Sequence, residues 1–191
     1  MPSSCGTWSL LRRSCPLAEF FRRAPDDVRA GVIEHVGHAL QATKTQIEPE
    51  VADRLRRFWE WRIKAARRDP KGHASEVGVF AWWFHSGKLD AKWSAEQMVE
   101  ALALSGRHEN QTLWMGGFSQ LAESETALAV RGLEQTVENT LKGKSTFWSD
   151  EEATVILRAG LNSSDPDVVY RAKRVKNALL RSGHSQFLDL P

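Results

Sequence analysis

The 191-residue sequence predicts an all-α protein, built as an α-solenoid of about four antiparallel helical pairs. Apolar residues recur at helical spacing in each long segment, and no period-two run bounded by turn residues indicates a strand. Helical pairs are expected to begin near residues 17, 50 or 74, 109 and 149. That spacing is close to the roughly 35–47-residue period of paired-helix repeats, in which each pair is covered by a neighbour.

Two amphipathic helices are expected first, over residues 25–41 and 50–68. Asp26 and Asp27 lie at the start of the first helix, where carboxylates complement the helix dipole. The stripe expected to face the core is Val28, Val32, Val36 and Leu40 in the first helix. In the second helix the core stripe is Ala52, Leu55, Trp59, Ile63 and Ala66.

The stretch 76–93, EVGVFAWWFHSGKLDAKW, carries three of the eight tryptophans. As a helix up to His85 it is apolar nearly all round, which is typical of a helix buried on two or more sides. Gly87 is expected to end this helix, and Ser94-x-x-Gln97 is a capping box for the next one. The aromatic side chains expected to be largely buried here are Phe80, Trp82, Trp83 and Phe84.

Four further helices complete the prediction. They are expected over residues 110–121, over 126–141, from the capping box Ser149-x-x-Glu152 to Gly160, and from Asp165 onward. Asp165 is expected to cap the last helix by accepting a hydrogen bond from its first turn. That helix should bury Val168, Ala172, Val175 and Leu179.

The composition favours one folded unit, because 41% hydrophobic residues are enough to form one core. We expect a disordered leader over residues 1–16 and a helical-repeat domain over residues 17–191. Both cysteines, Cys5 and Cys15, fall in the leader, which provides no disulfide framework and favours a cytoplasmic location. No segment has the length and apolar character of a membrane span, so a membrane partner is not expected.

The turn before the last helix also carries a resemblance. An Asp-Pro pair followed by valine, arginine and small residues occupies positions 165–172, with fainter versions at 25–31 and 130–133. This pattern resembles HEAT-type repeats, in which the acidic residue caps the second helix of a pair and the arginine bonds to the adjacent repeat. The resemblance implies a HEAT-like solenoid.

The aromatic segments at 58–62 and 80–93 resemble the HEAT-like C-terminal region of large bacterial proteins that carry an NTPase or other effector domain further upstream. Several proteins of that kind are associated with anti-phage defence. The resemblance covers residues 48–190 and implies a module that binds or senses a macromolecule as part of a larger effector protein.

No residue pattern indicates catalysis, a cofactor or a metal. Residues 143–146, GKST, match the end of a phosphate-binding loop, but Glu138 stands where its first glycine is needed and a helix precedes it. His35 and His38 lack a third ligand at a metal-binding spacing. We therefore expect a non-catalytic scaffold. The alternative is a nucleic-acid-binding HEAT-like protein of the DNA glycosylase type, although no glycosylase motif matches residue by residue.

One face of the helix over residues 50–68 is the predicted binding site. Its residues, at offsets of 0, 3, 7, 10 and 14, are Arg54, Arg57, Trp61, Lys64 and Arg68. Tryptophan and arginine are common anchors of interfaces, so an acidic protein partner is expected. Nucleic acid stacked on Trp61 is an alternative, although a net charge of +2 is far from the usual basic footprint. A third interpretation is that Trp61 packs against a neighbouring repeat.

Overall fold

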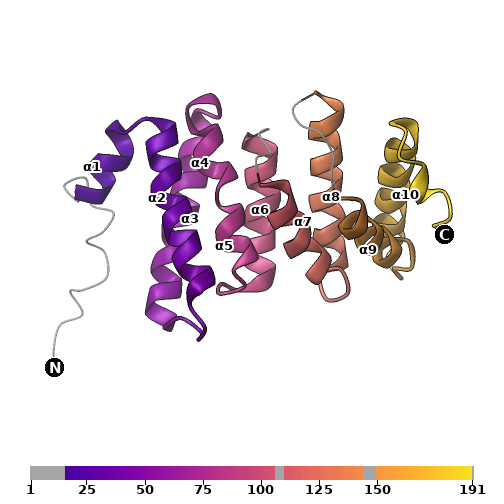
Figure 1. The fold of residues 1–191 in the computed structure, drawn as a ribbon, viewed down its shortest axis with the longest axis horizontal. Helices are drawn as coiled ribbons and strands as arrows, with labels where there is room; N and C mark the ends of the chain where they lie inside the picture. Colours follow the sequence, from indigo (N-terminus) through magenta and orange to yellow (C-terminus); the bar gives the residue numbers. More distant parts are fainter. Residues whose placement is uncertain (1–15, 106–109, 144–148, 191) are drawn as a thin grey trace.

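The helices follow one another in chain order along the long axis of the molecule (Figure 1). This computed structural model describes residues 16–105, 110–143 and 149–190. Within these ranges the regular structure is helical, without a strand, which confirms the predicted all-α class. The leader expected over residues 1–16 lies outside them, apart from Pro16, which begins the first helix.

The described residues contain the following regular elements. The first five helices are α1 (Pro16–Arg23), α2 (Asp26–Ala42), α3 (Pro49–Arg68), α4 (Ala74–Gly78) and α5 (Ala81–His85). The others are α6 (Ala91–Ser105), α7 (Gln111–Gln120), α8 (Thr126–Leu141), α9 (Asp150–Leu161) and α10 (Pro166–Arg181). Two single 3₁₀ turns, η2 (Lys71–His73) and η3 (Ser185–Phe187), precede α4 and follow α10.

The helices from α4 onward alternate between two rows. In one row α4, α6, α8 and α10 contact one another in that order, and in the other α5, α7 and α9 do the same. Chain neighbours such as α7 and α8, or α9 and α10, pack across the rows. At the N-terminal end α2 packs on both α4 and α5, while α3 packs on α4 and α6. One hydrophobic core runs from Phe21 to Phe187.

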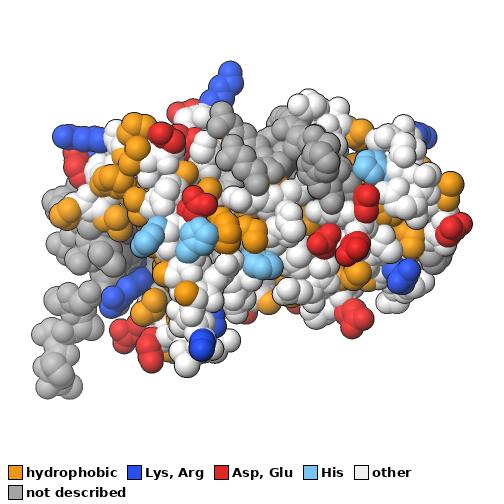
Figure 2. Space-filling model, in the orientation of Figure 1, with side chains coloured by type: hydrophobic (Ala, Val, Ile, Leu, Met, Phe, Trp, Pro, Cys, Tyr) orange, Lys and Arg blue, Asp and Glu red, His pale blue; other side chains and the backbone are white. Residues whose placement is uncertain are grey.

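The core face of α2 differs from the predicted stripe. Val28 is 44% exposed and Val32 is 38% exposed, and Figure 2 shows hydrophobic side chains gathered on the surface over α1 and α2. The buried face consists of Arg29, Ala30, Ile33, Gly37 and Leu40. Of the predicted stripe, Leu40 is therefore buried as expected and Val36 packs partly buried against the core. Gly37 accounts for this orientation, because a Cβ there would lie 2.4 Å from the Cβ of Trp82. Only glycine permits such a close approach of α2 to α5.

The aromatic stretch forms two short helices instead of the single predicted helix. The backbone turns more tightly at Val79 and Phe80, between α4 and α5. The interruption lets Phe80 stack on Trp59 of α3, with ring centroids 4.6 Å apart. It also lets the indole Nε1–H of Trp83 donate to the carbonyl of Ile33 in α2, at 2.8 Å. The single predicted helix is therefore replaced by two short helices: both pack on α2 and α6, but α4 also packs on α3 and α5 also packs on α7.

Burial of the aromatic side chains agrees with the prediction at three of four positions. Phe80, Trp83 and Phe84 are buried, whereas Trp82 is half-buried. The ring of Trp82 lies against the imidazole of His38, with centroids 4.0 Å apart. Trp82 therefore belongs to the boundary between core and surface.

The predicted capping box at Ser94 is wrong. The backbone N–H of Trp93 donates to Oδ1 of Asp90 at 2.8 Å, so Asp90 caps α6 one turn earlier. Ser94 is buried inside the first turn, where its hydroxyl donates to the carbonyl of Ala91. Two polar residues could have started this helix, and the aspartate at the earlier position does so.

The last two helices begin where the sequence predicts. The carboxylate of Asp165 accepts a hydrogen bond of 2.9 Å from the N–H of Asp167, which confirms the predicted cap of α10. Ser149 precedes α9 as expected, but its side chain forms no capping hydrogen bond to that helix. Both helices thus start at the predicted residue, but only Asp165 forms the predicted capping hydrogen bond.

Candidate functional site

The five residues predicted to bind a partner lie along α3, and we call them the α3 stripe. Arg54, Lys64 and Arg68 are exposed, whereas Arg57 and Trp61 are half-buried. The stripe is separate from the core face of α3, where Trp59, Ile63 and Ala66 are buried as predicted. The remaining predicted core residues, Ala52 and Leu55, are partly buried against the same core.

The cations of the α3 stripe are only partly neutralised. Arg57 pairs with Asp53 at 2.7 Å, and Arg54 approaches Glu50 at 3.7 Å. Lys64 and Arg68 form no ion pair with any residue in the part of the chain that the structure describes. The four cations of the stripe and the two carboxylates that pair with them sum to a charge of +2. The C-terminal half of the stripe can therefore attract an anionic group directly.

Trp61 is held in place by three neighbouring side chains. Its ring lies edge-on to Phe21 of α1 and to Phe58, with centroid distances of 6.1 Å and 5.8 Å. The guanidinium of Arg62 lies 4.4 Å from the centroid of the Trp61 ring and 5.1 Å from that of Phe21. Such contacts combine cation–π attraction with a fixed ring orientation. Trp61 is neither freely exposed nor fully covered.

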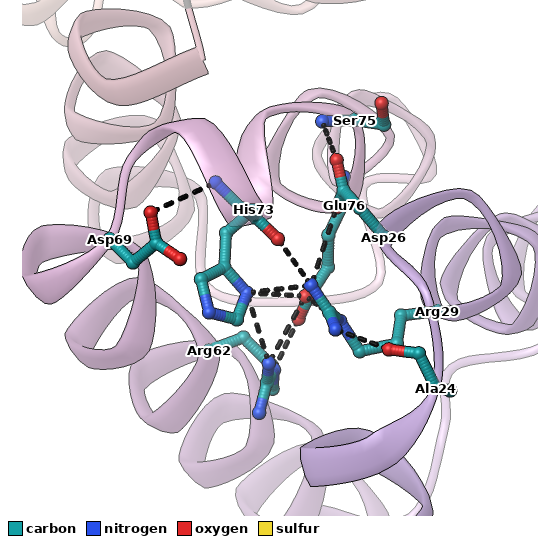
Figure 3. Close-up of polar contacts among 9 residues, drawn as sticks. Ala24, Asp26, Arg29, Arg62, Asp69, His73, Ser75 and Glu76 are labelled. Carbon is teal, nitrogen blue, oxygen red and sulfur yellow. Dashed lines mark hydrogen bonds and ion pairs between the residues drawn. The ribbon is translucent and has the colours of Figure 1, made fainter.

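Arg62 connects the α3 stripe to a buried ionic cluster (Figure 3). The carboxylate of Glu76 is completely buried and accepts hydrogen bonds from Nε of both Arg62 and Arg29, the latter at 2.6 Å. Nη2 of Arg62 also donates to Glu76, at 3.1 Å. The cluster thereby joins α2, α3 and α4 through one carboxylate.

His73 completes the cluster at its edge. Its Nδ1 lies 2.8 Å from Oε2 of Glu76, and 3.1 Å and 3.2 Å from Nη2 of Arg29 and of Arg62. One ring nitrogen cannot donate to the carboxylate and accept from a guanidinium at the same time. The position of the imidazole proton therefore selects which of these contacts is a hydrogen bond.

Neighbouring backbone groups explain why the cluster forms at this place. Asp26 of the adjacent helix α2 caps α4, since its carboxylate accepts from the N–H groups of Ser75 and Glu76 at 2.8 Å and 3.0 Å. Asp69 accepts from the N–H of Gly72 at 3.1 Å and shapes the turn before η2. Arg29 also donates to the carbonyl of Gly72. Charged side chains thus hold the backbone on both sides of η2.

The surroundings of Glu76 favour its charged form. Burial alone would raise the pKa of Glu76. The hydrogen bonds and charge of Arg62, together with hydrogen bonds from His73 and Arg29, lower this pKa by more than burial raises it. The net pKa lies below the ordinary value for glutamate. Because the carboxylate is completely buried and paired, the cluster is suited to holding helices together rather than to receiving a substrate.

Sequence reasoning missed this cluster, although two signals were present. Glu76 is the only acidic residue in the apolar segment 76–85, and Arg62 falls one turn after Trp59 on the inward side of α3. A buried cation needs a buried partner. Only the fold shows that these two residues and Arg29, 47 positions before Glu76, meet.

The histidine pair noted in the sequence lies on α2, and Figure 2 shows histidine side chains on the surface over this part of the molecule. His35 is exposed, and His38 lies 3.8 Å from Glu34 and against Trp82. No group of three potential metal ligands occurs among the residues that the structure covers.

Two further sequence features concern a loop and the membrane. Residues 144–146 of the GKST segment lie outside the described ranges. Across residues 16–105, 110–143 and 149–190, no helix combines the length and the apolar character that a membrane crossing requires.

Comparisons with known proteins give no relative. No family model matches the chain, and neither a curated protein nor a solved structure matches it.

Proposed function

We propose that this protein is a non-catalytic scaffold of the HEAT-like α-solenoid type, which binds an acidic protein surface through the α3 stripe. The two rows of helices support the solenoid, since each helix contacts the next member of its own row as well as its chain neighbour. The Asp165 cap supports the HEAT-like turn before α10. As the resemblance implies, such a module would act as part of a larger bacterial effector protein.

The observation that carries the binding proposal is the setting of Trp61. An aromatic side chain makes a strong interface anchor when its rotamer is already fixed, because less conformational entropy is lost on binding. Phe21, Phe58 and Arg62 fix this ring. Lys64 and Arg68 follow it along the helix with their charges exposed. A rigid aromatic group beside free cations fits an acidic protein surface that carries an apolar side chain.

The test is selection of peptides from a random display library on the immobilised protein. We expect enrichment of peptides that combine Asp or Glu with an apolar residue. Their affinity should fall at least tenfold for Lys64→Glu/Arg68→Glu, whose sites are exposed and leave the core unchanged. Binding should also weaken as salt rises, because exposed charges are screened.

The matched control is Arg131→Glu/Arg158→Glu on α8 and α9. These residues are also exposed, and the variant changes the net charge by the same amount. Equal losses in both variants would mean that net charge, and not the α3 stripe, governs binding. If the selected peptides lack acidic residues, or if single-stranded DNA displaces them from the α3 stripe, an acidic protein partner is the wrong assignment.

A further inference from the structure

Tyr170 lies on the exposed face of α10, in the N-terminal part of the helix. It is the single tyrosine of the sequence, and it is 64% exposed. The buried face of the same helix consists of Val168, Ala172, Val175 and Leu179. At about 100° per residue these four lie on the side of the helix opposite Tyr170. The aromatic ring therefore contributes little to the core and has no packing role that would explain it.

Cations and an amide continue the line that Tyr170 begins. At offsets of 3, 4, 7 and 11 from Tyr170, the exposed residues of this surface, the α10 stripe, are Lys173, Arg174, Asn177 and Arg181. The guanidinium of Arg174 lies 6.0 Å from the centroid of the Tyr170 ring. From Tyr170 to Arg181 the stripe extends about 16 Å along the helix axis.

Within the described ranges, one carboxylate forms ion pairs with this side of α10. Glu134 of α8 pairs with Arg171 at 2.7 Å and lies 3.5 Å from Arg174. Asp167 lies in the first turn of α10, before the stripe. Lys173 and Arg181 form no ion pair within the ranges that the structure describes. The centre and the C-terminal end of the stripe are therefore positively charged.

We propose that the α10 stripe binds single-stranded nucleic acid. A base can stack on the exposed ring of Tyr170, while Lys173 and Arg181 contact phosphates and the Asn177 amide faces the same strand. A protein anchor would be expected to pack against other apolar side chains, as Trp61 does against Phe21 and Phe58, but Tyr170 is flanked by charged side chains such as Asp167, Lys173 and Arg174. This site is separate from the α3 stripe and does not depend on it, since α3 and α10 lie toward opposite ends of the molecule (Figure 1).

The experiment measures binding of a fluorescein-labelled oligothymidylate of about 12 nucleotides by fluorescence anisotropy. Tyr170→Ala should weaken binding roughly fivefold or more, whereas Tyr170→Phe should retain it, because stacking needs the ring and not the hydroxyl. Lys173→Glu/Arg181→Glu should weaken binding at least tenfold. It should also reduce the slope of log K against log salt by about 1.4, as expected for the loss of two phosphate contacts.

One variant serves as the control for charge. Arg131→Glu/Arg158→Glu changes the net charge equally, and it should bind the oligonucleotide nearly as the unmodified protein does. Circular dichroism should be unchanged in every variant, because all these residues are exposed. The proposal is overturned if the oligonucleotide does not bind at low salt, if Tyr170→Ala binds normally, or if the two charge variants lose affinity equally. Displacement of the oligonucleotide from the α10 stripe by a glutamate-rich peptide of higher affinity would assign the surface to a protein instead.

Discussion

Both halves of the molecule contain helices that approach closely at glycine, as α2 does at Gly37, but among the described residues only the N-terminal half adds a buried ionic junction. In the N-terminal half α2, α3 and α4 meet at the buried carboxylate of Glu76, which takes hydrogen bonds from two guanidinium groups. In the C-terminal half the helices approach closely at glycines. A Cβ on Gly132 would lie 2.4 Å from the ring of Phe118, and one on Gly160 would lie 2.9 Å from the Cβ of Ala172.

This difference separates two ways of fixing the angle between helices. An ionic junction is directional, and it fails when one charge is removed because the others stay buried without a partner. A glycine contact depends on volume alone, so it tolerates changes of pH and salt but not an added methyl group. The two halves should therefore respond to different perturbations.

The largest effect is expected for Glu76→Ala. It leaves Arg29 and Arg62 buried without their carboxylate, which should destabilise the protein by about 3–5 kcal/mol. Urea unfolding followed by far-ultraviolet circular dichroism measures this loss. The control is Glu100→Ala, which removes the partner of the exposed Arg67 and should change stability little. Equal losses in the two variants would show that the buried cluster does not hold the N-terminal half.

Acid should weaken the same junction without a mutation. Folding lowers the pKa of Glu76 below its unfolded value of about 4.5. The ionised carboxylate therefore stabilises the folded protein fully above that pH, and this stabilisation is lost as the pH falls through the lower pKa of the folded state. Hydrogen exchange between pH 6 and pH 3, corrected for the intrinsic rate, should show protection falling in α2 to α4 before α8 to α10. The regional difference should disappear in Glu76→Gln. Uniform loss of protection in the unmodified protein would contradict the comparison.

Adding a methyl group should affect the C-terminal half. Gly132→Ala and Gly160→Ala should each lower the free energy of unfolding by about 1–3 kcal/mol, because a rigid ring or a helix must move. Gly31→Ala in α2 is the matched control, since no atom lies within 4 Å of its Cβ position. The free energy of unfolding of that variant should rise by about 0.5–1 kcal/mol, because alanine is more favourable than glycine in a helix interior. Thermal unfolding measures all three, and a loss at Gly31 as large as the others would remove the volume argument.

The smallest effect concerns the start of α10. Asp165→Ala removes the hydrogen bond to the N–H of Asp167 and should cost about 1 kcal/mol. Asp165→Asn keeps an acceptor and should lose less. Chemical denaturation of both variants measures the free energy of unfolding. Equal stability of Asp165→Ala and the unmodified protein would show that the capping hydrogen bond contributes nothing.

The outline of the fold was predictable because helical periodicity and turn residues are local. The bounds of α8 and the cap of α10 agree with expectation. The errors arise where two local signals compete or where a distant side chain decides. The cap of α6 was assigned to Ser94 but is formed by Asp90, and the face of α2 depends on the approach of Trp82 to Gly37.

The candidate site divides in the same way. The spacing of the α3 stripe on one helix could be read from the sequence, and the exposure of Arg54, Lys64 and Arg68 agrees with it. The orientation of Trp61 could not be read, because it is set by Phe21 on another helix and by Arg62, which a remote carboxylate holds.

The sequence by itself determined that this chain is helical, where most helices begin and end, and which cations follow one another along α3 and α10. These properties depend on residues within one or two helical turns of each other. Only the tertiary structure decided which face of α2 is buried, that the aromatic helix divides in two, and that Arg29, Arg62 and Glu76 share one site. Burial and charge pairing between distant segments depend on how helices pack, and a local pattern carries no information about that packing.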